Sequence, residues 1–167
     1  AVKSDLLTGS MSASPNLGVE LMLSERFTLE DGFHYNPFPA GGDRRWKHWF
    51  VQPELRYWMC QPYGGHFFGA NLMYGVYNVA KARLPFGLFK GIRSERYEGD
   101  FTGVGISYGY HFILSPRWGL ETSIGVGFLH TGYERYRCSH CGERTGSGNR
   151  NLVAPTKAAI SIVYMIK

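Results

Sequence analysis

Apolar and polar residues alternate along much of this chain with a period of two. Between Val104 and Phe112 every even-numbered position is apolar or aromatic. Successive residues of a strand point to opposite faces, so this stretch predicts a strand with one large face and one thin face. A thin face of small residues is typical of a narrow barrel that is apolar outside and packed inside. The thin face comprises Gly105, Ser107, Gly109 and His111.

The same alternation, bounded by turn residues, predicts eight strands. They cover roughly residues 2–12, 16–23, 27–36, 46–59, 66–79, 98–114, 118–133 and 151–166. Short connections alternate with long ones at 37–45, 80–97 and 134–150. This alternation is typical of outer-membrane barrels, whose tight turns are periplasmic and whose longer loops are extracellular. We therefore expect one all-β domain over residues 1–167, an eight-stranded antiparallel up-and-down transmembrane β-barrel with both termini in the periplasm.

Two positions break the pattern. Asp31 falls on the apolar register of the strand at 27–36, which predicts a slip in register or a bulge near Gly32. Pro53 lies in the middle of the strand at 46–59. Because proline has no N–H to donate to a ladder, we expect a bulge or an unpaired position there.

Composition agrees with a barrel and excludes a helical membrane anchor. Aromatic residues make up 16% of the 167 residues, and 22 are glycine, which strands and turns explain better than helices do. The mean hydropathy is −0.23, and no apolar run is long enough for a transmembrane helix. A barrel strand needs only about 9–11 residues to cross a bilayer. No signal peptide is visible, so the barrel prediction implies a mature chain.

Charged residues on the predicted inner face form the first candidate site. The interior of an eight-stranded barrel is filled by side chains, and buried charges must be paired. We expect a structural salt-bridge core; the alternatives are a gated polar path or a catalytic dyad. The spacing favours no specific acid–base pair. The residues are Glu20, Glu54, Arg56, Glu121 and Lys157.

Basic residues are concentrated in the predicted long loops and their flanks. The segments 37–47, 80–97 and 134–150 hold 12 of the 18 Lys and Arg against four acids, which gives them a net charge of +8 and the rest −3. Arginine is suited to bidentate contact with phosphate, so a basic collar would face lipopolysaccharide or a partner; a solvated loop surface explains it equally well. The candidate contact residues are Arg44, Arg45, Lys47, Arg93, Arg96, Arg135 and Arg137.

The stretch C-S-H-C-G at 138–142 is a further candidate. A C-x-x-C pair is half of a four-ligand zinc site, and the third cysteine, Cys60, lies in a turn at the opposite end. We expect a disulfide between Cys138 and Cys141, with zinc or free thiols as alternatives. No hydrolase, nucleotide-binding or metalloprotease motif is present, so we expect no catalysis, no cofactor and no metal.

Several segments together resemble a known family. The most specific is W-K-H-W-F-V-Q-P-E-L-R-Y-W at 46–58, and others lie at 14–20, 35–37, 65–69, 97–99, 107–110 and 155–158. Over nearly its whole length the chain resembles a functionally uncharacterised family of small outer-membrane barrels from Bacteroidota. The resemblance implies an eight-stranded barrel like the transmembrane domain of outer membrane protein A. Members are often associated with fimbrial gene clusters.

We therefore expect a non-catalytic integral outer-membrane barrel that serves as a structural or accessory subunit of a larger outer-membrane or fimbrial assembly. The expected partners are outer-membrane lipid, lipopolysaccharide and a larger protein complex. Nucleic acid is disfavoured because the aromatics lie on strand faces and not on one stacking platform. The alternatives are a small free-standing pore, a lipopolysaccharide-binding or lipid-modifying barrel using Ser107 and His111, and a soluble ligand-binding barrel.

Overall fold

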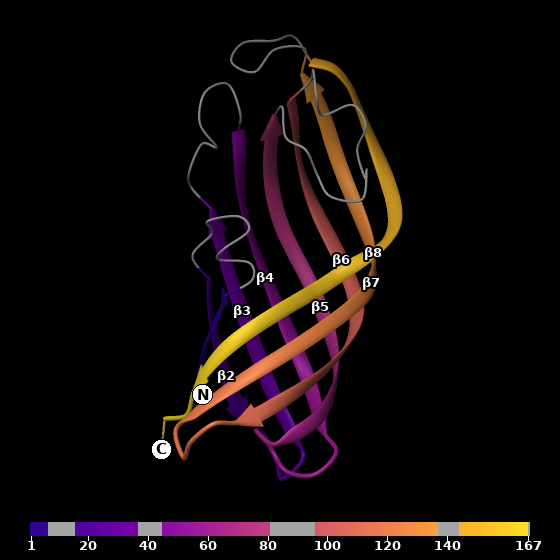
Figure 1. The fold of residues 1–167 in the computed structure, drawn as a ribbon. Coiled ribbons are helices and arrows are strands. Elements are labelled where there is room, and N and C mark those ends of the chain that lie inside the picture. The colour runs from indigo at the N-terminus through magenta and orange to yellow at the C-terminus, as the bar shows by residue number, and fades with distance from the viewer. Residues whose placement is uncertain (7–15, 37–44, 81–95, 137–143, 167) are drawn as a thin grey trace.

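The structure, a computed structural model, describes residues 1–6, 16–36, 45–80, 96–136 and 144–166. Each strand pairs antiparallel with the next, and β1 pairs with β8, so the strands form a closed ring in sequence order (Figure 1). This confirms the predicted all-β fold of eight antiparallel strands. The strands are β1 (Val2–Asp5), β2 (Asn16–Met22), β3 (Phe27–Asn36), β4 (Arg45–Trp58), β5 (Gly65–Ala80), β6 (Arg96–Ile113), β7 (Trp118–Tyr136) and β8 (Arg144–Tyr164).

The ring is uneven in height. β1 has 4 residues and β2 has 7, whereas β6, β7 and β8 have 18, 19 and 21. The short turns and both ends of the chain lie together at one end, here called the lower end (Figure 1). β6, β7 and β8 rise furthest toward the opposite, upper end.

Several strand boundaries differ from the prediction. β1 ends at Asp5 instead of continuing to residue 12, and residues 7–15 lie outside the described part of the chain. β7 continues to Tyr136 and β8 begins at Arg144, seven residues before the predicted start at 151. The T-G-S-G-N composition of residues 145–149 is typical of a loop, but this segment pairs with β7, with a register shift next to Tyr136.

The two faces of the wall alternate as predicted. On β6, Val104, Ile106 and Tyr108 are exposed, whereas Ser107 and His111 are buried. Gly, Ser and charged positions therefore face inward, and large apolar side chains face outward. Exposed apolar side chains on other strands include Leu17, Val19, Leu21, Leu29, Phe33, Trp49, Leu55, Leu72, Ile124, Phe128, Ile160 and Ile162.

Glycines on the inner face make room for large neighbouring side chains. A Cβ atom added at Gly109 would lie 2.3 Å from the ring of Phe67. One added at Gly69 would lie 2.3 Å from Ser107 Oγ and 2.7 Å from the carboxyl carbon of Glu54. Since protein interiors are close-packed, the glycines allow a narrow ring to hold bulky side chains.

Asp31 needs neither of the predicted irregularities. β3 keeps a single register with β2 and with β4 along its whole length, so the predicted slip or bulge near Gly32 is wrong. Asp31 lies on the outer face and is exposed.

Pro53 interrupts a ladder, as one of the two predictions proposed. The β4–β5 pairs at Val51 and Glu54 flank an unpaired stretch at Gln52 and Pro53, and the register is the same on both sides. A register shift does occur in another ladder, between Gly125 and Val126 where β7 pairs with β8.

Candidate functional site

The lower half of the ring encloses seven charged side chains, here called the interior cluster. β1, β2, β3, β4, β7 and β8 all contribute, so residues far apart in sequence meet in the lumen. The structure brings together the five predicted interior residues and adds two more. The cluster comprises Lys3, Glu20, Glu30, Glu54, Arg56, Glu121 and Lys157.

Arg56 lies at the centre of the cluster. Its Nε donates a hydrogen bond to Glu54 Oε1 at 2.7 Å. Its Nη1 donates to Glu121 Oε2 at 3.0 Å and to Glu20 Oε2 at 3.2 Å. Its Nη2 lies 3.0 Å from Glu121 Oε1 and also contacts Glu30. One fully buried guanidinium therefore contacts four carboxylates from four strands.

Two lysines complete the charge balance. Lys3 Nζ donates to Glu121 Oε2 at 2.6 Å. Lys157 Nζ bridges Glu30 Oε2 and Glu54 Oε1, each at 3.0 Å. Three cations against four carboxylates leave a net charge of −1 (3 − 4). Near-neutrality is required because an unpaired buried charge is strongly destabilising.

Neutral side chains satisfy the remaining acceptors of the cluster. Ser107 Oγ donates to Glu54 Oε2 at 2.9 Å. Thr28 donates to Glu20 and accepts from Trp58 Nε1 at 2.9 Å. The cluster is thus held by neighbouring side chains of the wall, an arrangement typical of a structural core.

No hydrogen bond joins Ser107 to His111 in the described structure. His111 Nδ1 lies 3.6 Å from Glu121 Oε2, and neither ring nitrogen makes a hydrogen bond within the described residues. Ser107 is committed to Glu54. Each residue therefore faces a different carboxylate of the interior cluster.

Aromatic side chains close the lumen beneath the cluster. Trp58, Phe67 and Val163 are completely buried. Arg56 Cζ lies 4.3 Å from the ring centroid of Phe67, a cation–π contact. Tyr63, in the turn between β4 and β5, packs against Trp58 at 5.9 Å between centroids, and burial raises the pKa of its hydroxyl. Among the described residues, these side chains and the interior cluster occupy the lower lumen, and a small cavity of about 90 Å³ remains beside Lys3, Glu30 and Lys157.

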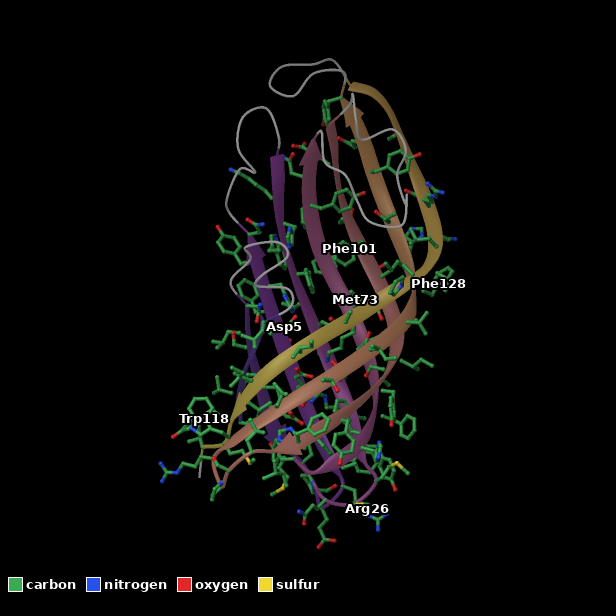
Figure 2. All side chains as sticks on the ribbon, in the orientation of Figure 1. Asp5, Arg26, Met73, Phe101, Trp118 and Phe128 are labelled. Atoms are coloured by element: carbon green, nitrogen blue, oxygen red, sulfur yellow. The ribbon has the colours of Figure 1, made fainter. Side chains whose placement is uncertain are left out.

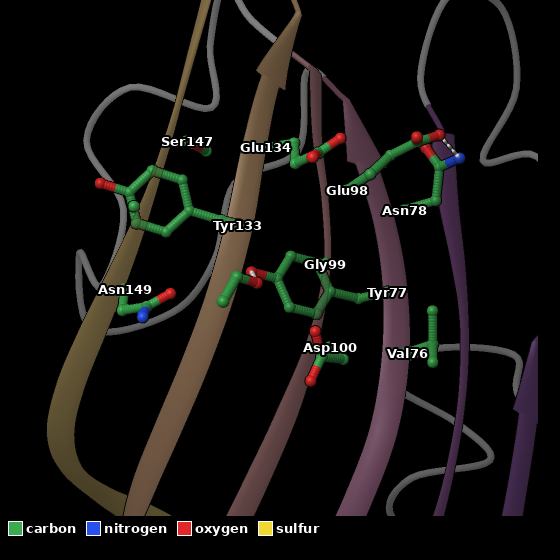
Figure 3. A pocket seen from close by; sticks show the side chains of 12 residues that line it. Val76, Tyr77, Asn78, Glu98, Gly99, Asp100, Tyr133, Glu134, Ser147 and Asn149 are labelled. Atoms are coloured by element: carbon green, nitrogen blue, oxygen red, sulfur yellow. Dashed lines mark hydrogen bonds between the residues drawn. The ribbon is translucent and has the colours of Figure 1, made fainter.

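A separate cavity of about 790 Å³ lies at the upper ends of β5–β8 (Figure 3). Tyr77 Oη reaches across Gly99 to Thr131 Oγ1 at 2.9 Å and donates to the carbonyl of Gly132 at 3.3 Å. These bonds tie β5 to β7. The lining residues include Val76, Tyr77, Asn78, Glu98, Asp100, Tyr133, Glu134, Ser147 and Asn149.

The structure describes only some of the basic residues that were predicted to lie in the long loops. Lys47 is an exposed residue of β4. The structure corrects the placement of three arginines, which belong to strands and not to loops because the ladders of β4–β7 continue past the apolar surface; they are Arg45, Arg96 and Arg135. Arg44, Arg93 and Arg137 lie outside the described residues.

The cysteine prediction also falls mainly outside the described chain. Cys138 and Cys141 are among residues 137–143, which the structure does not describe. Cys60 is exposed and free. Within the described ranges, no group of three or more His, Cys, Asp or Glu is arranged to hold a metal ion.

Sequence reasoning missed Lys3 and Glu30 as members of the interior, whereas His111 was already placed on the inner face. Glu30 lies directly opposite both Glu20 and Glu54 in the ladders. Counting every second residue along both strands from the turn at 24–26 would have predicted that Glu30 faces inward, opposite Glu20. Lys3 carried no comparable signal, since its contact with Glu121 depends on closure of β1 onto β8.

Fold and interior together define the class of eight-stranded antiparallel barrels with a charged, side-chain-filled lumen. The chain belongs to a family described as protein of unknown function (DUF3575), whose model matches residues 1–166. No curated protein and no solved structure gives a significant match. In the described chain, no helix has the length and apolarity to cross a membrane, a criterion that concerns helices alone.

Proposed function

We propose that this protein is a non-catalytic integral barrel of the outer membrane of a Gram-negative bacterium, with its termini in the periplasm. In this proposal it serves as a structural or accessory subunit of a larger outer-membrane or surface assembly. The fimbrial context and the origin in Bacteroidota rest on the sequence resemblance alone.

The distribution of polar groups is the observation that supports this proposal most. A water-soluble barrel would turn its apolar face inward, but here Leu55, Leu72, Ile106 and Ile124 are 44–67% exposed while Arg56 is completely buried. Contiguous exposed apolar surface on this scale marks contact with lipid or with other proteins. Closure of the ring supports the same proposal, because an open sheet edge would leave backbone groups unpaired in lipid.

Aromatic pairs near both ends of the apolar surface add support. Trp118 and Tyr164 lie near the lower end, with ring centroids 4.9 Å apart (Figure 2 labels Trp118). Trp49 and Tyr74, further up their strands, are 5.8 Å apart. Such aromatics favour the two interfaces of a bilayer.

The filled lumen favours an accessory role over a pore or an enzyme. In the described residues the interior cluster, Trp58 and Phe67 occupy the lower lumen, and Ser107 donates a hydrogen bond to Glu54. Lys47, exposed on β4, remains a candidate contact for lipopolysaccharide phosphate. Planar-bilayer recordings separate the pore alternative, since a filled barrel is expected to be silent.

The test is recovery of the tagged protein from native outer membranes in mild detergent, followed by mass spectrometry. We expect a larger outer-membrane protein in stoichiometric amount. Recovery of the barrel alone with lipid would contradict the accessory role. Recovery from the soluble fraction, monodisperse without detergent, would contradict membrane integration itself.

A further inference from the structure

Asp31 is a carboxylate in the middle of an apolar surface. It points outward from β3 and is exposed. On its own strand the neighbours on the same face are Leu29 and Phe33, which are 39% and 48% exposed. Directly opposite it on the adjacent strands lie Val19 and Pro53. Every immediate neighbour on the outer face is therefore apolar.

This carboxylate has no partner in the described part of the chain. Among the described residues, none makes a hydrogen bond or an ion pair with Asp31. An ionisable group that faces lipid is unfavourable and marks a functional position by default. Nothing in the fold requires an acid here, because the adjacent interior position, Glu30, already supplies the carboxylate that the lumen uses.

A groove lies beside Asp31 on the same outer surface. Pro53 leaves the β4–β5 ladder unpaired at this point. On its far side is an apolar depression of about 540 Å³ across β4–β7, whose walls include Leu72 and Val104. Asp31 and the groove share Pro53 as a border, so one continuous surface offers an anionic point and an apolar recess.

We infer that this surface of β3–β5, centred on Asp31 and Pro53, is where a membrane-spanning segment of a different outer-membrane protein docks. The segment would place a lysine or arginine against Asp31 and apolar side chains in the groove. The inference rests on the proposed accessory role and names the surface that performs it.

The negative charge of Asp31 argues against two other occupants of this surface, lipid headgroups and a second copy of this chain. Lipid phosphates are anionic and would be repelled. A two-fold contact with a second copy of this chain would bring two Asp31 carboxylates together, which is unfavourable. No lysine or arginine faces outward from the apolar part of the described strands, so a second copy offers no strong cation at this depth.

The test uses a photoreactive benzoyl-phenylalanine placed in the full-length protein in native outer membranes. One version carries it at Phe33, next to Asp31, and a control carries it at Ile124 on β7, away from the groove. We expect one defined adduct from position 33 and none from position 124. The peptide captured from the partner should come from a membrane-spanning stretch with a lysine or arginine.

Dependence on the carboxylate is measured with Asp31→Leu in the position-33 version. The adduct should fall by about tenfold or more, because truncating one member of a desolvated charge pair removes most of the binding. Asp31→Asn should give an intermediate yield. Asp100→Leu, which removes an outward carboxylate on β6, is the matched control and should leave the yield unchanged. Gel mobility before and after heating shows that each variant is folded.

The outcomes separate this surface from the accessory role. An adduct insensitive to Asp31→Leu, or one formed at position 124 and not at 33, overturns the docking surface but not the role. An adduct between two copies of this chain overturns the inference in favour of self-association. If a partner is recovered but no adduct forms, the docking surface around Asp31 is wrong and the partner binds elsewhere on the barrel. Absence of both contradicts the surface and the accessory role together.

Discussion

The lower and upper halves of the barrel distribute polar groups in different ways. In the lower half the lumen holds Arg56 with its glutamates, and the outer face is largely apolar, with Asp31 as an exposed carboxylate. In the upper part of β5–β8, the inner face carries Met73 and Phe101, whereas the outer face carries Asp100 and Asn149 (Figure 2 labels Met73 and Phe101). The lower half is inverted relative to a soluble protein, whereas in the upper part polar side chains occur on both faces, with Thr131 and Tyr77 hydrogen-bonded inside and Asp100 outside.

If the barrel lies in the outer membrane as proposed, this difference would mark the boundary between lipid and water across its wall. The same strands run through both regions, so backbone pairing does not determine which face is polar. The solvent does, because apolar side chains face whichever medium is apolar. The four predictions below test that contrast, beginning with the largest effect.

Arg56→Ala should destabilise the barrel most. Removing the guanidinium leaves four carboxylates in the lumen with two lysines, and breaking a buried ion pair costs about 3–5 kcal/mol. Urea unfolding in detergent or lipid, followed by heat-modifiable gel mobility, measures the change. Arg117→Ala, in an exposed turn at the same end, is the control and should have little effect. Equal stabilities of the two variants would contradict a stabilising role for the buried ion pairs of Arg56.

Ile106→Arg should be the next most damaging change. Ile106 is 67% exposed on the outer face of β6, and a lipid-facing arginine near the midplane costs about 2–4 kcal/mol. Asn149→Arg, on the outer face of β8 in the upper part, should be close to neutral. Unfolding in lipid vesicles is the measurement. If both substitutions were tolerated alike, the outer surface of the lower half would not be in lipid.

Gly69→Ala tests the packing of the inner face. The added methyl would clash with Glu54 and Ser107, and overpacking of this kind costs about 1–3 kcal/mol. At Gly132, in the upper part, the closest atom to an added Cβ is 3.5 Å away. Gly132→Ala should therefore leave the free energy of unfolding nearly unchanged. A larger loss at Gly132, which lies on the outer face, than at Gly69 would contradict the tight packing of the inner face.

Tyr77→Phe should have the smallest effect of the four. It removes the hydroxyl that joins β5 to Thr131 and Gly132, and a single hydrogen bond contributes about 0.5–1.5 kcal/mol. Tyr74→Phe, on the outer face of the same strand, is the control. Hydrogen exchange of the upper β5–β7 amides reports the change locally. Unaltered exchange in Tyr77→Phe would show that this bond does not stabilise the upper strands.

Much of the fold was readable from alternation alone. Small and charged positions of β4, β6 and β7 fall two residues apart, so the inward placement of Glu54, Arg56 and Glu121 follows from strand geometry. The assembly of those residues into one cluster follows from the small diameter of an eight-stranded ring.

The rest depends on contacts that period-two reasoning does not encode. Lys3 joins the cluster through ring closure, which links the first strand to the last. The early start of β8 was hidden because its glycine-rich first residues read as a loop and gain strand structure only by pairing with β7. Asp31 led to the opposite error: a slip or bulge was expected in order to hide the charge, but the strand is regular.

Tryptophan quenching by lipids brominated in their acyl chains tests the inverted lower half most directly. The chain has four tryptophans, and single-tryptophan variants with phenylalanine at the other positions would retain either Trp118 or Trp58. Trp118 is 48% exposed on the outer surface, whereas Trp58 is completely buried in the lumen. We predict strong quenching of Trp118 and little quenching of Trp58 in reconstituted vesicles. Unquenched Trp118, or equal quenching of both, would contradict a lipid-embedded barrel with a filled interior.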